Sequence, residues 1–432
     1  MSLIEKIEKR EARVAVVGLG YVGLPMVVTV ARNGFKVLGF DIQQKRVDQI
    51  NRGENYIGDV DSTELKSLVE KNLITATADY SKIKDIDVIL VAVPTPLDKY
   101  KQPDSSYVVS STRSIAENIS KDTLLVLEST TYPGTTREIV TPEIEKRGFV
   151  VGRDLFIAFS PERVDPGNLS FKTDNTPKVV GGMTPECNRI AEIFYKSVLK
   201  ADVFMVSSPE VAEMEKIYEN TFRNINIALA NEMTILCEKM GIDIWEVIEA
   251  ASTKPYGFMP FYPGPGIGGH CIPLDPFYLT WKAREFNYHT RLIELAGEIN
   301  NSMPDFVVNK AMSILNKRGK AISRSKILLI GAAYKKDIED IRESPIQMVI
   351  NLLEKTGCYP NYNDPYIPEF VNEINHKHYR SVELDRIDKY DLVIIITDHS
   401  VYDYQDIIER SELILDTRLA TNGIRSEKII RL

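Results

Sequence analysis

The chain has 432 residues, of which 44% are hydrophobic and 26% charged, as in an ordinary globular protein. Its formal net charge of −8 argues against nucleic acid or an anionic membrane as a partner. No apolar run reaches the roughly 18 residues that cross a bilayer, and the charged N-terminus lacks the apolar core of a signal peptide. We therefore expect a cytoplasmic protein of two to four domains, at roughly 100–200 residues each.

Strand-like and helix-like segments alternate from residue 13 to about residue 205. The strand-like runs are RVAVVGLG (13–20), KVLGF (36–40), DVILVAVP (87–94), TLLVLEST (123–130), FIAFSPE (156–162) and PKVVGG (177–182). This alternation predicts an α/β fold, in which a parallel sheet is wrapped by helices as in doubly wound domains.

The middle of the chain has a different character, because residues 209–241 form one continuous helical pattern that begins at a proline and closes at a glycine. A helix of this length spans roughly 45 Å, which suggests a spine between domains or a dimer surface. Strand–helix alternation restarts near residue 324 with SKILLIGAAYK. We therefore expect three domains, over residues 1–207, 208–315 and 316–432.

The first strand is followed directly by a glycine-rich turn, in which Gly18, Gly20 and Gly23 form the pattern G-x-G-x-x-G. A helix-like segment comes next, and Asp41 ends the following strand. Such glycines let the backbone approach a pyrophosphate at a helix N-terminus, while the acid accepts hydrogen bonds from ribose hydroxyls. The pattern predicts an NAD site, although Arg46 is near enough to neutralise the 2′-phosphate of NADP. The alternative is a tight turn that only packs helix on sheet.

Two threonines mark the ends of later strands in the same half. Thr95 follows DVILVAVP and Thr130 ends TLLVLEST. Ligands of open α/β sheets lie outside the carboxyl ends of the strands, so both are candidate contacts of the cofactor or of water, with turn-forming threonines as the alternative. The cofactor contacts expected in this half are Gly18, Gly20, Tyr21, Val22, Gly23, Asp41, Arg46, Thr95 and Thr130.

The chain has four cysteines and no C-x-x-C pair, so it predicts neither a disulfide framework nor a zinc site, and we expect no bound metal. Cys187, Cys237 and Cys358 are typical of small buried hydrophobic residues. Cys271 differs, because it follows the glycine-rich run GPGIGGH (264–270), where exposed backbone N–H groups would favour a thiolate. Cys271 is therefore a candidate nucleophile.

Polar residues share one face of the long predicted helix, where Glu213, Lys216 and Asn220 lie three and four residues apart. The other face carries Met214, Ile217 and Tyr218. Glu162 lies in the loop after FIAFS, at another strand end. A solvated charged face and a surface loop are the simpler interpretations, and spacing alone does not decide between them and a catalytic role.

The motifs in combination resemble those of the UDP-glucose/GDP-mannose dehydrogenase family along the whole chain. They are GLGYVGLP, VAVPTP, EST, SPER, EMEKIYENTFR, GPGIGGHCIPLDP and AYKKDIEDIRESP. The resemblance implies an N-terminal Rossmann domain for NAD, a central helical region that forms a homodimer, and a C-terminal Rossmann-like domain that helps to bind a UDP-sugar. Family members oxidise a sugar C6 alcohol to a carboxylate with two NAD.

The same resemblance implies residue roles. Cys271 attacks the intermediate aldehyde to form a thiohemiacetal, which is oxidised to a thioester. The other catalytic assignments are Lys216 and Asn220 for the oxyanion, Glu162 as general acid or base, and Asp275 with Thr130 for the hydrolytic water. Substrate contacts are expected from Glu162, Arg163, Lys216, Asn220, Phe261, Tyr262, Gly268, Tyr334 and Lys335, and a cofactor contact from Arg342.

The substrate is predicted from CIPLD, in which Leu274 stands where glucose-oxidising members of the family carry lysine. Residues 251–266 resemble the branch that acts on UDP-N-acetylglucosamine, so we favour that sugar, with the uronic acid serving surface polysaccharide synthesis. UDP-N-acetylmannosamine and N-acetylgalactosamine substrates stay open. So do two other classes of protein: a two-electron dehydrogenase of the 3-hydroxyacid type and a non-catalytic NAD-binding protein.

Overall fold

The computed structural model describes residues 1–58, 60–98, 102–165, 167–168, 170–269 and 272–432. The chain forms two compact units, the first of Met1–Glu219 with Phe277–Tyr288 and the second of Asn220–Pro276 with His289–Leu432. The division falls within α8 (Pro209–Met240), whose 32 residues confirm the long helix predicted from the sequence. The expected boundaries of three domains stay a prediction.

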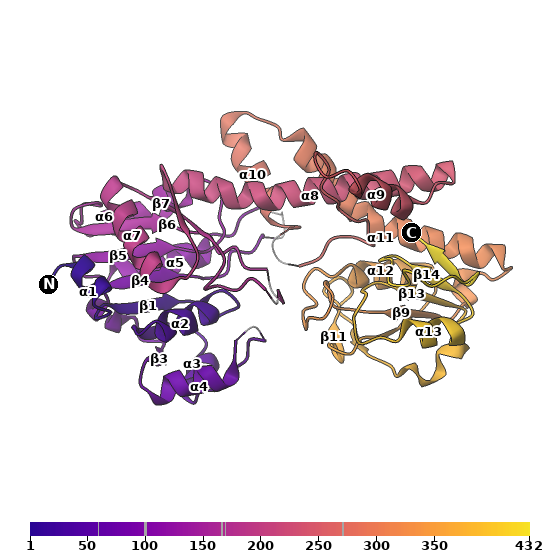
Figure 1. The fold of residues 1–432 in the computed structure, drawn as a ribbon, viewed down its shortest axis with the longest axis horizontal. Coiled ribbons are helices and arrows are strands. Elements are labelled where there is room, and N and C mark those ends of the chain that lie inside the picture. Colours follow the sequence, from indigo (N-terminus) through magenta and orange to yellow (C-terminus); the bar gives the residue numbers. More distant parts are fainter. Residues whose placement is uncertain (59, 99–101, 166, 169, 270–271) are drawn as a thin grey trace. The chain divides into compact units, whose positions relative to one another are not determined.

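An eight-stranded sheet forms the centre of the first unit, in the order β3-β2-β1-β4-β5-β6-β7-β8 (Figure 1). Its strands are β1 (Arg13–Val17), β2 (Lys36–Phe40), β3 (Ile74–Thr77), β4 (Val88–Val91), β5 (Thr123–Leu127), β6 (Leu155–Phe159), β7 (Lys178–Gly182) and β8 (Val203–Val206). The edge strands β3 and β8 lie outside the predicted strand-like runs.

One pair of strands departs from the predicted parallel sheet, because β6 and β7 run antiparallel while the other neighbours pair in parallel. A parallel neighbour needs a crossover connection, which is usually a helix. The described residues between β6 and β7 contain no helix, so the chain turns back beside β6.

Helices cover both faces of this sheet, because successive strand residues point to opposite sides. Val14 and Val16 of β1 belong to one apolar core, while Ala15 and Val17 belong to the core on the other face. The first core includes residues of α1 (Leu3–Glu8), α2 (Gly23–Arg32), α3 (Gln44–Asn51), α4 (Ser62–Glu70) and α7 (Pro185–Val198). The second includes residues of α5 (Ser106–Ala116) and α6 (Thr141–Glu145), so the doubly wound prediction is confirmed.

A series of helices follows the first sheet along the chain. α8 ends before Gly241, whose φ of 71° is the left-handed conformation that glycine adopts most readily after a helix. The next helix, α9 (Ile244–Ser252), begins after Asp243, whose carboxylate accepts the N–H of Trp245. α10 (Asp275–Ala283) and α11 (Arg291–Lys317) complete the series.

The second unit contains a five-stranded parallel sheet in the order β10-β9-β13-β14-β15. Its elements are β9 (Ile327–Ile330), α12 (Pro345–Lys355), β10 (Asn361–Asn363), β13 (Leu392–Ile395), α13 (Tyr404–Arg410), β14 (Ile414–Asp416) and β15 (Ile429–Arg431), with a hairpin of β11 (Glu369–Val371) and β12 (His378–Arg380). The apolar residues of α11 and α12 pack on one face and those of α13 on the other. This order repeats that of β2-β1-β4-β5-β6, so the second lobe is also a Rossmann-like doubly wound fold.

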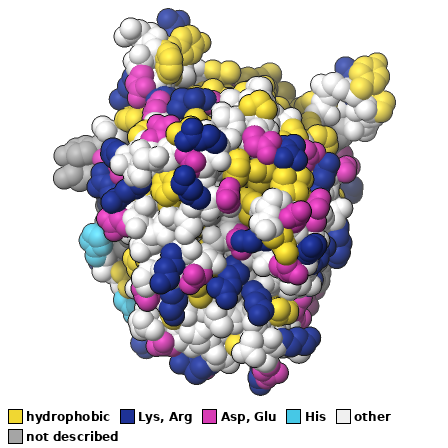
Figure 2. Space-filling view, turned by 90° about the vertical axis from the view of Figure 1, so that its left-hand side faces the viewer, with side chains coloured by type: hydrophobic (Ala, Val, Ile, Leu, Met, Phe, Trp, Pro, Cys, Tyr) yellow, Lys and Arg dark blue, Asp and Glu magenta, His cyan; other side chains and the backbone are white. Residues whose placement is uncertain are grey.

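The surface carries charges of both signs. Figure 2 shows one face of the molecule, on which Lys and Arg side chains are interspersed with Asp and Glu. Among the described residues, no helix combines the length and the apolar composition needed to cross a bilayer.

Candidate active site

The glycine-rich turn between β1 and α2 gives each of its three glycines a different role. Gly18 has a φ of 94°, and a Cβ there would lie 2.4 Å from the carbonyl oxygen of Ala92. A Cβ on Gly23 would lie 1.7 Å from the carbonyl oxygen of Gly18, so this glycine lets helix and strand pack closely. A Cβ on Gly20 would meet no atom of the described residues within 4 Å. The open space at Gly20, at the start of α2, fits a dinucleotide whose pyrophosphate approaches the backbone.

Asp41 is held against this turn. Its Oδ2 accepts the N–H of Leu19 at 3.1 Å, and its Oδ1 accepts the N–H of Gln43 at 2.9 Å. The guanidinium of Arg46 lies 3.3 Å from Oδ2 and also over the ring of Tyr56. The positive charge of Arg46 is therefore balanced by the acid that favours NAD, which lessens its suitability for a 2′-phosphate.

The other predicted cofactor contacts lie near the same edge of the sheet. Tyr21 is exposed and Val22 immediately precedes α2. Thr95 is buried after β4, and its carbonyl oxygen accepts a hydrogen bond from the hydroxyl of Tyr278. Thr130 is half-buried after β5. The turn, Asp41 and Thr95 thus bring together the features that an NAD site needs at the carboxyl ends of the strands.

Glu162 lies in a charged environment that the sequence patterns do not reveal. Its Oε2 is 3.3 Å from the Nζ of Lys178, which also lies 3.1 Å from Oε1 of Glu128. Lys178 and Glu128 are buried. Both are functional candidates missed from the sequence, and their only signal was a charged residue at the start of one apolar strand run and directly after another.

Arg163, predicted to contact substrate, is engaged by neighbours within the first unit. Its guanidinium donates to Glu219 and to the carbonyl oxygen of Pro177 at 3.0 Å, and lies 3.4 Å from Glu215. These carboxylates anchor the loop after β6 to the start of α8.

The polar face of α8 is the buried face. Glu213, Lys216 and Asn220 are 0%, 6% and 1% exposed, whereas Met214 and Tyr218 are 40% and 67% exposed. The interpretation of a solvated charged face is therefore wrong. The placement of Ile217 on the opposite face is also wrong, since the residue is buried with Tyr132 and Tyr278. A helix with this reversed pattern needs partners on both sides, because buried polar groups need hydrogen bonds and exposed apolar rows favour association.

Glu213 is satisfied by a backbone turn. Its carboxyl accepts the N–H of Gly134 at 2.6 Å, and the N–H and hydroxyl of Thr136 at 2.8 and 2.7 Å. Burial raises the pKa of Glu213 to about 7 against the effect of these donors. Glu213 thus fixes the segment after β5 to α8.

Asn220 and Asp275 meet within the second unit. The side-chain amide of Asn220 donates to Oδ2 of Asp275, and Asn224, one turn further along α8, donates to the carbonyl oxygen of Ile272 at 3.2 Å. Helix α8 is therefore hydrogen-bonded to the segment that follows the predicted nucleophile in the chain. Cys271 itself lies outside the described residues. Cys187, Cys237 and Cys358 are buried, as predicted.

The glycine run before Cys271 lies on the loop that follows β9. A Cβ on Gly268 would lie 2.6 Å from Cβ of Tyr334, and one on Gly269 would lie 2.7 Å from the ring of Tyr334. The N–H of Gly269 also donates to the carbonyl oxygen of Arg342 at 3.0 Å. Two motifs separated by more than sixty residues of sequence are thereby joined. The glycines are needed because Tyr334 leaves no room for a side chain at either position, its Cβ at Gly268 and its ring at Gly269.

The remaining predicted contacts also lie in the second unit. The guanidinium of Arg342 forms a double hydrogen bond with Asp340, at 2.6 and 3.0 Å. Phe261 packs edge to face against Phe222 of α8, and Tyr262 stacks on Trp245 of α9. Lys335 follows Tyr334 in the loop after β9.

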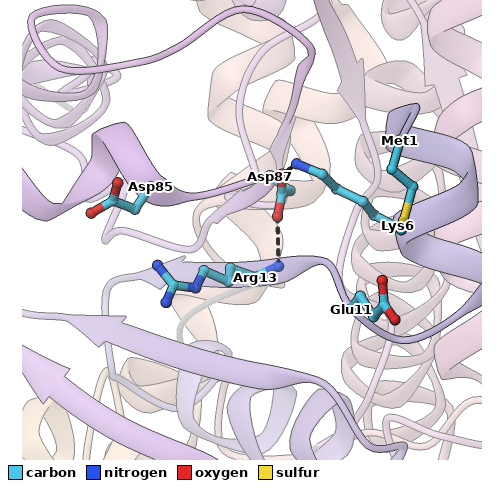
Figure 3. A pocket seen from close by; sticks show the side chains of 6 residues that line it. All are labelled: Met1, Lys6, Glu11, Arg13, Asp85 and Asp87. Atoms are coloured by element: carbon cyan, nitrogen blue, oxygen red, sulfur yellow. Dashed lines mark hydrogen bonds and ion pairs between the residues drawn. The ribbon is translucent and has the colours of Figure 1, made fainter.

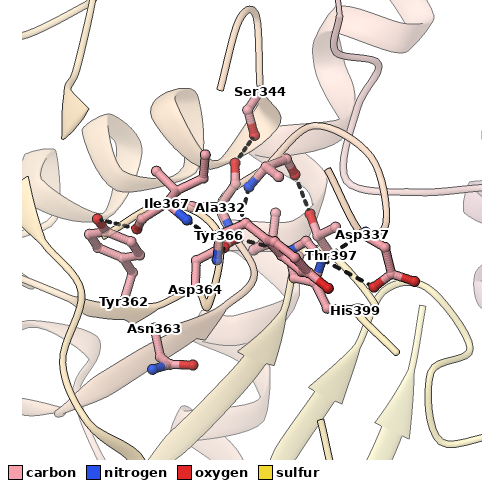
Figure 4. A network of polar contacts seen from close by, with 12 residues as sticks. Ala332, Asp337, Ser344, Tyr362, Asn363, Asp364, Tyr366, Ile367, Thr397 and His399 are labelled. Atoms are coloured by element: carbon pink, nitrogen blue, oxygen red, sulfur yellow. Dashed lines mark hydrogen bonds and ion pairs between the residues drawn. The ribbon is translucent and has the colours of Figure 1, made fainter. Parts of the chain in front are cut away.

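A buried polar network holds that loop in place (Figure 4). Asp364, which follows β10, accepts the N–H groups of Ala332 and Ala333 at 2.5 and 3.0 Å. His399 lies 2.9 Å from the same carboxylate, and its Nδ1 accepts the N–H of Asp337 at 2.9 Å. The imidazole therefore carries its proton on Nε2 and donates it to Asp364. Neither His399 nor Asp364 was a predicted site residue, because contacts between chain segments this far apart leave no local pattern.

The cavity in Figure 3 lies elsewhere. It measures about 290 Å³ and is lined by Met1, Lys6, Glu11, Arg13, Asp85 and Asp87. Arg13 begins β1 and Asp87 precedes β4, so the cavity lies at the amino ends of these strands, opposite the edge where α/β sheets bind ligands.

Comparison with known proteins identifies what this arrangement is similar to. Models of the UDP-glucose/GDP-mannose dehydrogenase family match in three parts: the NAD binding domain at residues 12–199, the central domain at 210–302 and the UDP binding domain at 328–423. The UDP-N-acetyl-D-glucosamine 6-dehydrogenase of Pseudomonas aeruginosa is 37% identical, over 83% of this chain and 84% of that protein. The UDP-N-acetyl-D-mannosamine dehydrogenase of Methanococcus maripaludis is 35% identical, over 90% and 87%. The structure of UDP-D-ManNAc dehydrogenase from Pyrococcus horikoshii aligns with a TM-score of 0.88 and 30% identity, over 97% of this chain and 98% of that one.

Proposed function

The chain belongs to the UDP-glucose/GDP-mannose dehydrogenase family and is an NAD-dependent UDP-sugar dehydrogenase, and we propose that it oxidises the C6 hydroxyl of UDP-N-acetylglucosamine to the uronic acid. The observation that supports this proposal is the close approach of Gly268 and Gly269 to Tyr334. It joins the segment that leads to the proposed nucleophile to a loop of the UDP binding domain. A nucleotide-sugar held by that loop has its sugar close to the nucleophile segment.

The reaction runs as two oxidations at one carbon. The first removes a hydride from C6 and the proton of its hydroxyl, leaving an aldehyde. The Cys271 thiolate adds to the aldehyde carbon, and the carbonyl oxygen takes up a proton to give a thiohemiacetal. Loss of a second hydride and of the hydroxyl proton gives a thioester, which water hydrolyses to the carboxylate and the free thiol. NAD, when bound at the first glycine-rich turn, accepts each hydride.

We assign the remaining catalytic roles to residues of this chain. Lys216 and Asn220 lie one turn apart on the buried face of α8, and we assign them to the developing oxyanion. Glu162 serves as general acid or base, and Asp275 with Thr130 orients the hydrolytic water. The hydrogen bond from Asn220 to Asp275 supports placing both in one site. The covalent thiohemiacetal retains the aldehyde between the two oxidations.

Two features support the N-acetylglucosamine assignment. Leu274 stands where glucose-oxidising relatives have lysine, and the relative from Pseudomonas aeruginosa is named for this activity. UDP-N-acetylmannosamine is the second candidate, favoured by the relatives from Methanococcus and Pyrococcus. We further propose a homodimer built on α8, because its exposed face carries a row of large apolar side chains, namely Met214, Tyr218, Phe222, Leu229, Met233, Leu236 and Met240.

The test is a turnover panel of UDP-sugars with the product identified by mass. We expect UDP-N-acetylglucosamine to be used fastest and two NADH to appear for each uronate. Faster oxidation of UDP-N-acetylmannosamine would transfer the assignment to the second candidate. Cys271→Ser should stop release of acid while Cys237→Ala, a change at a buried cysteine of α8, should not. Undiminished acid production by Cys271→Ser would exclude the covalent route, and one NADH per product would indicate a two-electron dehydrogenase.

A further inference from the structure

A buried charge cluster lies behind Glu162 in the first unit. Lys178 is the first residue of β7 and Glu128 directly follows β5. The Nζ of Lys178 lies 3.1 Å from Glu128 and 3.3 Å from Glu162, and the side chains of Lys178 and Glu128 are 4% and 0% exposed. Lys178 therefore links the proposed acid or base to a second carboxyl that has no access to solvent.

The cluster contains more acid than base. One ammonium group contacts two carboxyls, and the other polar partner of the Glu128 side chain among the described residues is the neutral hydroxyl of Tyr195 on α7, which donates to Oε1 at 2.5 Å. An unbalanced charge inside a protein is costly, and the usual response is to bind or release a proton. Lys178 can offset only one of the two carboxyls, and the charge of the buried Lys216 acts on Glu162, so Glu128 is the carboxyl left to become neutral by binding a proton.

Hydrogen bonding identifies which carboxyl holds the proton. Glu162 accepts the N–H groups of Arg163 and Val164 on Oε1, both at 2.9 Å, in addition to the contact with Lys178 on Oε2. Donors of this kind stabilise an ionised carboxylate. Oε2 of Glu128 is buried and has no hydrogen-bond partner among the described residues. The extra proton therefore belongs on Glu128.

The acidities of the four groups agree with this arrangement. Burial raises the pKa of Glu128, because the attraction of Lys178 does not offset it. Burial acts the same way on Glu162, but Lys178, the N–H of Val164 and the charge of Lys216 outweigh it, so the pKa of Glu162 lies below its usual range. The two carboxyls raise the pKa of Lys178 against the effect of burial, and burial raises that of Tyr195.

We propose that Glu128, Lys178 and Tyr195 are positioning residues that hold Glu162 as a carboxylate, by keeping the one extra proton of the cluster on Glu128. Glu162 then enters the reaction as a base, and the proton it takes up brings the cluster to a net positive charge that favours its release to solvent. This inference rests on the proposed role of Glu162 in the reaction. It adds three buried residues to the determinants of that role.

The first test needs no turnover. Infrared spectra of the full chain, recorded well above pH 7 and compared between the unmodified protein and each variant, report protonated carboxyls directly. We expect one such band in the unmodified protein that disappears in Glu128→Gln and changes frequency in Tyr195→Phe, because the hydroxyl of Tyr195 donates to Glu128. The high pH is chosen because Glu213 and Glu215, with pKa values raised to about 7, are then ionised. Absence of a band that depends on Glu128, or a band that Tyr195→Phe leaves unchanged, would overturn the proposal.

The second test uses the pH dependence of turnover. Lys178→Met removes the cation that faces Glu162, so the acidic limb of the kcat profile should move up by about one pH unit, a tenfold change in proton concentration. Lys178→Arg keeps the charge and should restore the limb. Lys282→Met is the matched control, because Lys282 is also buried between two glutamates, Glu138 and Glu285, in the same unit. In Lys282→Met the acidic limb of the kcat profile should not move, although the stability of the protein should fall as it does in Lys178→Met.

An unmoved limb in Lys178→Met, or an equal shift in Lys282→Met, contradicts the proposal. Failure of this proposal can be distinguished from failure of the proposed function. A protein that turns over no UDP-sugar would refute the function while the infrared band still decides where the proton lies, and an active enzyme without the band refutes only the cluster.

Discussion

Nε2 of His399 lies 2.9 Å from Oδ2 of Asp364, and neither side chain has any exposed surface. Asp364 occupies in the second sheet the place that Asp41 has in the first. Each acid follows the second strand of its Rossmann-like order and accepts an N–H from the turn after the first strand, Leu19 in one unit and Ala332 in the other. In the second unit His399 contacts Asp364, so the carboxylate of Asp364 holds the protein's own loop in place.

Asp364→Asn is expected to loosen the loop from Ala332 to Glu343. The amide replaces one acceptor oxygen by a donor among groups that all donate, which costs roughly 3 kcal/mol of unfolding free energy. The KM for the UDP-sugar should rise more than kcat falls, since the loop carries Tyr334 and Lys335. Thermal denaturation and steady-state kinetics measure the two effects.

Asp388→Asn, in an exposed ion pair, is the matched control and should change neither quantity. The pKa of Asp364 is lowered, because His399 and the backbone N–H groups outweigh burial. Its stabilising effect is therefore complete above the ordinary aspartate pKa of about 3.9 and is lost as the pH falls below it. An unchanged KM in a folded Asp364→Asn protein would show that the network does not shape the substrate loop.

Gly20→Ala and Gly23→Ala should separate cofactor binding from folding. A methyl at Gly20 meets no atom of the described residues within 4 Å, so the unfolding free energy should change by less than about 0.5 kcal/mol, while NAD affinity falls about tenfold or more. A methyl at Gly23 collides with the carbonyl oxygen of Gly18, so stability should fall by about 2 kcal/mol or more. Calorimetry of unfolding and of NAD binding distinguishes them. Normal NAD affinity in Gly20→Ala would place the pyrophosphate elsewhere.

Glu213 is expected to make stability depend on pH near neutrality. Its pKa of about 7 in the folded protein exceeds the unfolded value of about 4.3, so the folded state binds the extra proton between these values. The free energy of unfolding should therefore fall as the pH rises from about 4 to about 7, by up to about 1.4 kcal/mol per pH unit from this group. Chemical denaturation across this range should show a shallower slope in Glu213→Gln.

The comparison with the unmodified protein removes the contribution of Glu215, which is present in both. Glu117→Gln, at an exposed position in the same unit, should leave the slope unchanged. Identical slopes for Glu213→Gln and the unmodified protein would mean that this carboxyl is ionised across the range.

The apolar row of α8 predicts which substitutions should dissociate the proposed dimer. Leu229 and Leu236 are 55% and 46% exposed and lie on the same side of the helix. Changing both to Glu places charges in an apolar contact, so sedimentation should show a monomer at concentrations where the unmodified chain is a dimer. Val401→Glu, at another exposed apolar position of the second unit, should leave the assembly intact. A monomeric unmodified chain would refute the dimer itself.

Local patterns were sufficient for the elements and for the cofactor turn. Alternating apolar runs located most of the strands, and the spacing of Gly18, Gly20 and Gly23 located the dinucleotide turn, because strand burial and turn geometry depend on neighbours within a few residues. The same patterns failed at β7, where the direction of pairing depends on what connects two strands. They also failed at Ile217, because the side that a helix buries is set by the elements around it.

The sequence by itself determined the family, the NAD turn and the length of α8, since each family motif, the turn and the helical pattern is a set of residues close together in the chain. Only the tertiary structure decided that the polar face of α8 lies inside, that Gly269 rests on Tyr334, and that Lys178 stands between Glu128 and Glu162. These are contacts between segments far apart in sequence. Whether a charged residue is solvated or buried beside another charge is settled by packing, and packing determines which carboxyl can remain ionised.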